Sequence, residues 1–176
     1  MKNSFLQSAA VHGLFMGLAL IILSLLDWKL GFYGQKFYFS LLSYAVIFAG
    51  LAYSATVYRK QTGGYISYGQ AYGYSITVAA AAAILSAAFT ILLMYVIDST
   101  YLETVLAFTE ETLLDAGLPQ AQVDMALEMS SKMTHPVISF LSSLFGTLFV
   151  SAIIALITSA IVKKANPNPF AGGENL

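Results

Sequence analysis

Four long apolar stretches without Asp, Glu, Lys or Arg dominate the pattern of hydrophobic and polar positions along the chain. They cover residues 4–26, 37–58, 63–97 and 134–162, and charged residues lie on both sides of each. An α-helix rises about 1.5 Å per residue, so about 20 apolar residues cross the hydrocarbon core of a bilayer. The pattern therefore predicts an all-α, polytopic membrane protein with four transmembrane helices.

Capping signals and charged boundaries set the expected ends of these helices. Ser67 precedes Gln70 by three residues, the spacing of a capping box, and the same spacing separates Ser4 from Gln7. We expect one transmembrane domain over residues 1–164, with spans at about 4–26, 38–58, 67–97 and 136–162. The tail, residues 165–176, is rich in Pro, Gly and Asn and is expected to be disordered.

The segment 98–134, between the third and fourth spans, has a different pattern. It contains seven acidic residues and a single Lys, Lys132. Thr100 and Glu103 have capping-box spacing, apolar residues recur at helical spacing up to Gly117, and Pro119 fits the first turn of a second helix. We therefore expect an extramembrane amphipathic helical hairpin here.

The basic residues near the span ends indicate the orientation. In a four-span arrangement one side carries Lys2, Arg59, Lys60, Lys163 and Lys164, and the other carries Lys29, Lys36 and Lys132. Because cytoplasmic loops of membrane proteins are enriched in Lys and Arg, this imbalance favours cytoplasmic N- and C-termini. The acidic segment 98–134 is then expected on the outer side.

Composition excludes several classes of function. The chain is 58% hydrophobic and 10% charged with a net charge of −1, so it lacks the basic surface that nucleic-acid binding requires. It has no Cys and two His, and it contains no phosphate-binding loop and no Gly-x-Ser-x-Gly motif. We therefore expect no nucleic-acid partner, no enzymatic activity, no catalytic residues, no cofactor and no metal site.

The first span carries an ionisable residue, His12, which lies about 12 Å into the helix. One interpretation is a proton or ion site, because polar groups at this depth are often functional. The interpretation that we favour is structural, with His12 hydrogen-bonded to a Ser or Tyr of another helix. Gly13 and Gly17 follow at the spacing that lets a neighbouring helix approach closely.

The fourth span has a stripe of small, weakly polar residues spaced by four. They are Ser139, Ser143, Thr147 and Ser151. Such stripes usually pack helices together. The alternative is a narrow polar pathway shared with Ser86 and Thr90 of the third span, which a single four-helix chain would need to oligomerise to enclose.

The most distinctive stretch is residues 63–74, which reads Gly-Gly-Tyr-Ile-Ser-Tyr-Gly-Gln-Ala-Tyr-Gly-Tyr after a basic end of the second span. Gly69 and Gly73 again have close-packing spacing, and Gln70 lies between them. This stretch resembles the bacterial DUF4199 family, small membrane proteins with a similar entry into the third helix. The resemblance implies a four-helix fold in the bacterial inner membrane, and it brings no known activity.

Two hypotheses for the function follow from these features. The small-residue faces and the absence of charge inside the spans favour a structural, accessory or interaction protein. Its partners would be the lipid bilayer and other membrane proteins or a second copy of itself. The alternative is a small oligomeric channel or transporter for an ion or small solute, in which His12, Gln70 and the Ser139–Ser151 stripe line a polar pathway.

Overall fold

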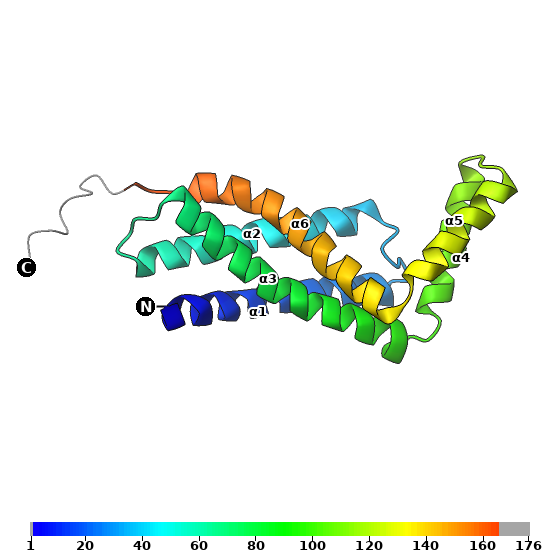
Figure 1. The fold of residues 1–176 in the computed structure, drawn as a ribbon, viewed down its shortest axis with the longest axis horizontal. Coiled ribbons are helices and arrows are strands. Elements are labelled where there is room, and N and C mark those ends of the chain that lie inside the picture. The colour runs from blue at the N-terminus through cyan, green and yellow to red at the C-terminus, as the bar shows by residue number, and fades with distance from the viewer. Residues whose placement is uncertain (1, 166–176) are drawn as a thin grey trace, which may run out of the picture.

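The structure is a computed structural model that describes residues 2–165 of the chain. Helices dominate this part, in the order α1, α2, α3, α4, α5, α6 (Figure 1). Their bounds are Lys2–Lys29, Phe37–Gln61, Tyr68–Leu92, Tyr101–Asp115, Gln120–Met133 and Pro136–Val162. A π-helical turn, η1 (Leu93–Ile97), continues α3. The described residues contain no extended strand, only an isolated antiparallel bridge between Ile66 and Lys164.

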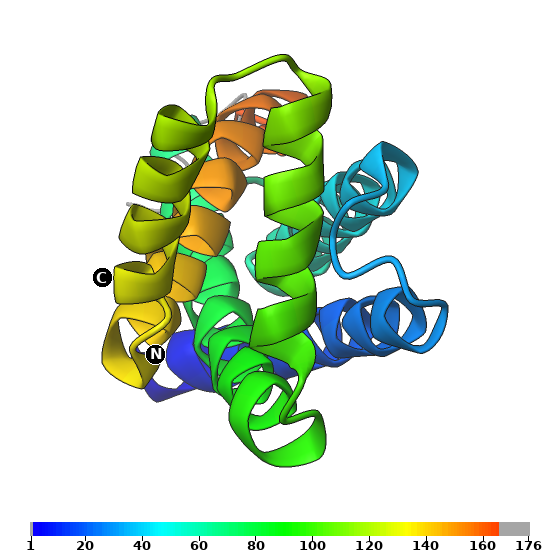
Figure 2. The ribbon, with the colours of Figure 1, turned by 90° about the vertical axis from the view of Figure 1, so that its right-hand side faces the viewer.

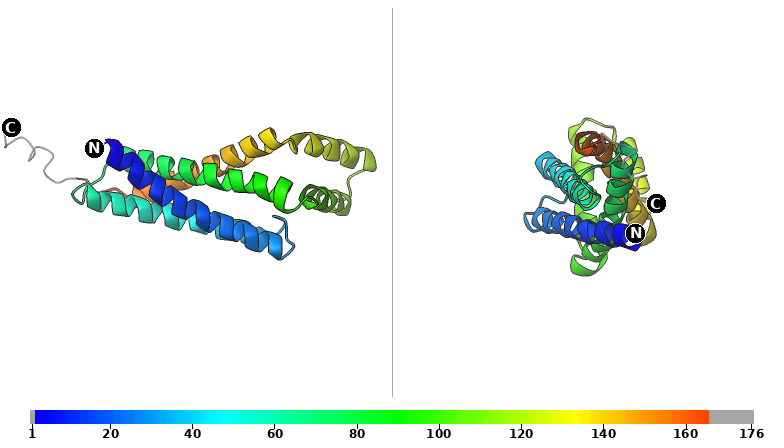
Figure 3. Two further views of the ribbon diagram at one scale, coloured as in Figure 1. Left: turned by 90° about the horizontal axis from the view of Figure 1, so that it is seen from below. Right: turned by 90° about the vertical axis from the view of Figure 1, so that its left-hand side faces the viewer.

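The four long helices α1, α2, α3 and α6 run side by side, and α4 and α5 lie beyond one end of this bundle (Figures 1 and 3). By length and composition all four long helices can cross a membrane, over Phe5–Lys29, Phe37–Gln61, Tyr68–Ile97 and Pro136–Val162. The prediction of an all-α chain with four such spans is confirmed.

The outer surface of the bundle is apolar. Phe15, Phe145 and Phe149 are 67%, 63% and 69% exposed, in the middle of their helices. Exposure of so many large apolar side chains is unfavourable in water, whereas acyl chains of a bilayer cover them without cost. The surface therefore fits a chain that crosses the membrane several times.

The interior is built largely from small residues around α3. The most extensive contacts between helices join α3 to α6 and to α1. Fully buried alanines line α3, at positions 71, 79, 82, 83 and 87. Small side chains let helix backbones approach closely, which is the main source of attraction between helices in lipid.

The capping predictions have mixed outcomes. Ser67 is the N-cap of α3, where its hydroxyl accepts from the Gln70 N–H at 3.2 Å and the Gln70 side chain accepts from the Ser67 N–H at 3.0 Å. The start expected at Ser4 is wrong, since α1 already begins at Lys2. The Thr100 capping box does not form, because the Asp98 carboxylate accepts from both the Thr100 N–H and its hydroxyl.

The segment 98–134 forms two helices. The α4 and α5 helices lie next to each other in front of the span ends (Figure 2). Gly117 follows α4 with a φ of +77°, and α5 begins at Gln120, directly after Pro119. Gly117 therefore takes the left-handed conformation that a glycine after a helix end provides.

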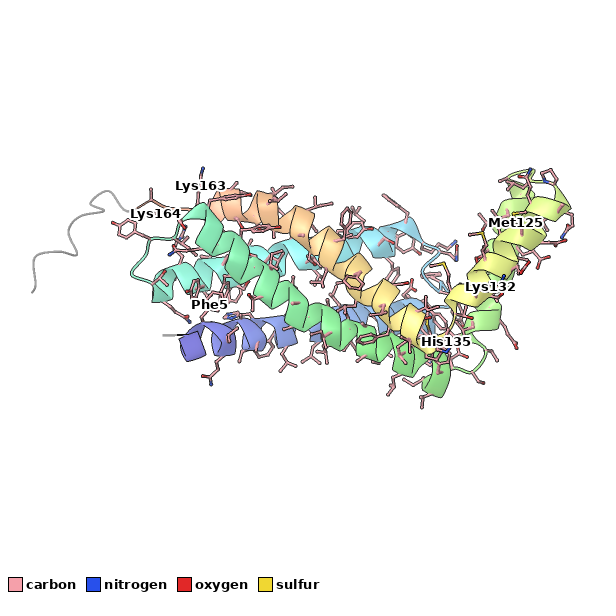
Figure 4. All side chains as sticks on the ribbon, viewed as in Figure 1. Phe5, Met125, Lys132, His135, Lys163 and Lys164 are labelled. Atoms are coloured by element: carbon pink, nitrogen blue, oxygen red, sulfur yellow. The ribbon has the colours of Figure 1, made fainter. Side chains whose placement is uncertain are left out.

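The two ends of the bundle differ in the charged residues that they carry. The end that holds the N-terminus and the connection between α2 and α3 is called the basic end and carries Arg59, Lys60, Lys163 and Lys164 (Figures 1 and 4). The opposite end, called the acidic end, comprises Asp27, Asp98 and the helices α4 and α5. The disorder expected for the tail, residues 165–176, falls on residues that lie outside the described part, except for Ala165.

Candidate functional site

His12 is bonded to its own helix and to α3. Its Nδ1 lies 2.7 Å from the Ser8 carbonyl oxygen and 3.0 Å from the Tyr74 hydroxyl oxygen. The Ser8 hydroxyl lies 2.9 Å from the same Tyr74 oxygen. Because a carbonyl oxygen only accepts, Nδ1 carries the hydrogen in this arrangement. The contact with Tyr74 supplies the partner from another helix that the structural interpretation of His12 requires.

Aromatic rings enclose this hydrogen-bonded group. Tyr58 of α2 stacks on Tyr74, with ring centroids 4.2 Å apart and planes 7° apart. Phe5, labelled in Figure 4, meets both rings edge-on at 5.5 and 5.4 Å. Tyr74 is completely buried, so the ring, its hydroxyl and their neighbours join α1, α2 and α3 at this level of the bundle.

The two Gly-x-x-x-Gly pairs have different surroundings. A Cβ on Gly13 would lie 2.5 Å from the Ala81 Cβ, and one on Gly17 would lie 2.9 Å from Leu85 Cδ2, so α1 and α3 meet closely at both. Apart from the chain neighbours and the backbone of α3 itself, no described residue has an atom within 4 Å of a Cβ placed on Gly69 or Gly73. The first pair therefore packs helices within this chain, and the second pair lies on an open face of α3.

The hydroxyl stripe of α6 does not act as one unit. Ser139 donates to the Met133 carbonyl at 3.2 Å, where the chain passes from α5 into α6. Ser143 and Thr147 line a cavity, and Ser151 is fully buried without a hydrogen-bond partner for its hydroxyl among the described residues. The stripe thus has three environments: the junction of α5 and α6 at Ser139, the cavity at Ser143 and Thr147, and the buried interior at Ser151.

The cavity lies in the half of the bundle nearest the acidic end and measures about 470 Å³. Hydroxyl groups from all four spans line it: Ser24, Ser40, Ser43, Ser86, Thr90, Ser143 and Thr147. The structure therefore brings Ser86 and Thr90 together with Ser143 and Thr147, as the polar-pathway hypothesis requires. His12 and Gln70 do not line this cavity.

Two further residues of the cavity were not anticipated from the sequence. Asp27 from the end of α1 and Tyr101 from α4 both line it. Asp27 was interpreted only as the polar boundary of the first apolar stretch. The available signal was its place at the end of an apolar helix, one turn after Ser24, which lines the same cavity.

A second carboxylate, that of Asp98, accepts hydrogen bonds from other segments of the acidic end. Asp98 Oδ2 accepts from Trp28 Nε1 at 2.8 Å and from the Tyr33 hydroxyl at 3.4 Å. The hydrogen bond from the Thr100 hydroxyl, and after it the one from Trp28, hold the pKa of Asp98 below its usual value. Burial, together with the nearby charge of Asp27, raises the pKa of Tyr101 to about 12, so this phenol keeps its proton.

The basic end is closed by backbone contacts. Arg59 donates to the Val162 carbonyl oxygen at 2.8 Å, which satisfies a free carbonyl at the end of α6. Ile66 and Lys164 exchange two backbone hydrogen bonds of 3.0 Å. Gln70 belongs to the capping box described above, so its side-chain oxygen is used locally.

No group of three or more His, Asp or Glu side chains that could hold a metal ion occurs among residues 2–165. The acidic residues of α4 and α5 are largely exposed, and the single ion pair in this part joins Lys132 to Glu128 at 2.7 Å on one helix. The arrangement is that of a solvated, negatively charged helix surface.

Comparison with known proteins gives a family match. A family model described as "Protein of unknown function (DUF4199)" matches residues 11–164, which include His12, the residues that line the cavity and the stretch 63–74. No curated protein and no solved structure matches the chain. The resemblance noted in the stretch 63–74 is thereby confirmed, and the chain belongs to the DUF4199 family of proteins of unknown function.

Proposed function

We propose that the protein is a non-enzymatic accessory protein of the bacterial inner membrane that assembles with a second copy of itself through α3. The observation that carries the proposal is the open face of α3 at Gly69 and Gly73. Within a bilayer, apolar side chains gain little by leaving lipid for another helix, so close backbone contact at small residues decides where helices associate.

The open face of α3 has the properties of an interhelical contact that lacks its partner. Gly13 and Gly17 show what this spacing does when it is filled, since α3 covers both of them. Gly69 and Gly73 lie exposed on α3, and Thr77, one turn further on, donates to the Gly73 carbonyl at 2.9 Å. Two copies of one such face can meet around a two-fold axis, because the surface is then its own complement.

Orientation forms part of the proposal. The described residues of the basic end carry Arg59, Lys60, Lys163 and Lys164 without an acidic residue beside them. By the positive-inside rule this end, with both termini, faces the cytoplasm. The α4 and α5 helices then form an extramembrane amphipathic hairpin on the outer side.

The test replaces both open glycines by Ile and measures the dimer fraction of the full chain in liposomes, by energy transfer between labelled copies. We expect energy transfer for the natural sequence and its loss in Gly69→Ile/Gly73→Ile. Ala10→Ile, on an exposed position of α1, is the matched control and should retain transfer. Equal transfer in all three proteins, or none in the natural sequence, would contradict the proposed assembly.

A small channel or transporter is the second candidate, and the hydroxyl-lined cavity is the observation that favours it. The test is solute flux in proteoliposomes, with Ser143→Leu as the variant that fills the cavity. Flux that the variant abolishes would support this candidate, and equal flux in protein-containing and empty liposomes across a broad panel of solutes would exclude it.

A further inference from the structure

We infer that the cavity at the acidic end is a binding site for a small primary ammonium compound with an apolar body, and that Asp27 is its counter-ion. The site goes beyond the proposed assembly and does not depend on it, because every residue that lines the cavity belongs to one chain.

The first step concerns the two oxygens of the Asp27 carboxylate. Oδ2 accepts from the Gly34 N–H at 2.6 Å. Oδ1 is buried and has no hydrogen-bond partner among the described residues. A carboxylate oxygen that is removed from water without a donor destabilises the fold. Asp27 Oδ1 therefore lacks a hydrogen-bond donor, and the Asp27 residue lines the cavity.

The second step concerns the hydroxyl groups of the wall. Three of them donate to carbonyl oxygens of their own helices: Ser43 to Phe39 at 3.0 Å, Ser86 to Ala83 at 3.2 Å and Thr90 to Ser86 at 3.0 Å. A hydroxyl has one hydrogen, so these groups have only lone pairs left to offer. These three hydroxyl groups are thus available only as acceptors, and the Asp27 carboxylate adds a negative charge to the wall.

This chemistry selects the class of ligand. An anion would meet acceptors and a carboxylate, whereas a primary ammonium group has three hydrogen-bond donors and a positive charge.

The size and the apolar part of the cavity argue for an organic cation. A volume of about 470 Å³ is far larger than a monovalent metal ion, and it falls in the range of small-molecule sites. Leu20, Leu23 and Ile47 form part of the wall, and the rings of Phe39 and Tyr44 add aromatic faces. An ammonium head on a short hydrocarbon or aromatic body would contact both kinds of surface.

The experiment measures binding to the full chain in lipid nanodiscs by calorimetry, with empty nanodiscs to correct for partition into lipid. The probes are 2-phenylethylammonium, its uncharged analogue 2-phenylethanol, and the anion phenylacetate. We expect saturable binding of the ammonium probe. Its affinity should exceed that of the alcohol by about tenfold or more, because a charge-assisted hydrogen bond contributes about 1.5–3 kcal/mol. Phenylacetate should not bind.

Three variants assign the binding to Asp27 and the cavity. Asp27→Asn keeps the shape and removes the charge, so it should lower the affinity for the ammonium probe by about tenfold or more. Asp124→Asn removes one charge from exposed α5 and should leave the affinity unchanged. Ser143→Leu keeps Asp27 and fills the cavity, so it should abolish binding. This variant tests the site independently should Asp27→Asn fail to fold.

Several outcomes would overturn the site. These are the absence of saturable binding by the natural sequence at millimolar probe, equal affinity for the ammonium and alcohol probes, or unchanged affinity in Asp27→Asn or Ser143→Leu. Loss of energy transfer between copies in the assembly test has no bearing on these results, so failure of the two proposals can be told apart.

Discussion

At the scale of single residues, the buried hydroxyl of Tyr74 is paired across helices. The Tyr74 hydroxyl meets both His12 and Ser8, although it lies in the core of an apolar bundle. In such surroundings an unpaired hydroxyl or imidazole nitrogen is unfavourable, so each group stabilises the position of the others. This network supplies the hydrogen bonds that the structural interpretation of His12 requires.

Removing the Tyr74 hydroxyl should therefore destabilise the bundle. In Tyr74→Phe the ring stack with Tyr58 is kept, and the contacts with His12 and Ser8 are lost. We expect the free energy of unfolding in detergent to fall by about 1–3 kcal/mol. Tyr53→Phe is the control, because Tyr53 is 67% exposed. Equal stability of both variants would show that the network contributes nothing.

The pairing of Asp98 predicts a dependence on pH. Its pKa is lowered in the fold, so its hydrogen bonds stabilise the fold above the unfolded value of about 3.9 and are lost as the pH falls through the folded pKa. Trp28 is the single Trp of the chain and donates to this carboxylate. Its fluorescence should stay constant through neutral and mildly acidic pH and change only below about pH 3.9.

Asp98→Asn tests whether protonation of Asp98, and not of another group, changes the Trp28 emission. The variant cannot ionise at position 98, so the change in Trp28 emission at low pH should disappear. A transition of the natural sequence centred above pH 4, or one that persists in Asp98→Asn, would show that another group controls the environment of Trp28.

At the scale of elements, the close approach of α1 and α3 rests on glycine. A Cβ on Gly13 would lie 2.6 Å from the Val78 carbonyl oxygen, which is backbone and cannot rotate away. Gly146 on α6 has no atom of the described part within 4 Å of the same position. Substitution by Ala should therefore change the free energy of unfolding differently at Gly13 and at Gly146.

We expect Gly13→Ala to lower the free energy of unfolding by about 1–3 kcal/mol, because the two helices must separate or strain to admit the methyl group. Gly146→Ala should leave stability unchanged or raise it by up to about 1 kcal/mol, since Ala favours the helix more than Gly. Denaturation in mixed detergent micelles measures both. A tolerated Gly13→Ala would mean that α1 and α3 do not meet as described.

The helices could be predicted from the sequence, but which helix faces pack against one another could not. Uninterrupted apolar stretches identify spans, and the Ser67 capping box forms as its spacing predicts. The pairs at Gly13 and Gly69 have the same spacing, yet only the first is covered within the chain, because tertiary arrangement decides which face meets another helix. The polar-pathway hypothesis anticipated the cavity in part, through Ser86, Thr90 and the stripe of the fourth span, but it missed Asp27 and Tyr101, because these come from other helices.

At the scale of the whole molecule, charge and apolar surface have separate places. Basic side chains mark one end of the bundle, acidic side chains dominate the other, and large apolar side chains cover the helices between them. A bilayer around the bundle would accommodate all three regions at once. The central claim is therefore that the four long helices cross a membrane, with the acidic end outside.

Cysteine labelling in intact cells tests this claim directly, because the chain has no natural Cys. Single substitutions at Thr62, Thr112 and Phe15 place the thiol at the basic end, on α4 and on the apolar surface of α1, all exposed in the folded chain. A membrane-impermeant maleimide should label Thr112→Cys in intact cells, Thr62→Cys only after the cells are opened, and Phe15→Cys in neither case. Labelling of Phe15→Cys would contradict a membrane-spanning bundle, and labelling of Thr62→Cys from outside would reverse its orientation.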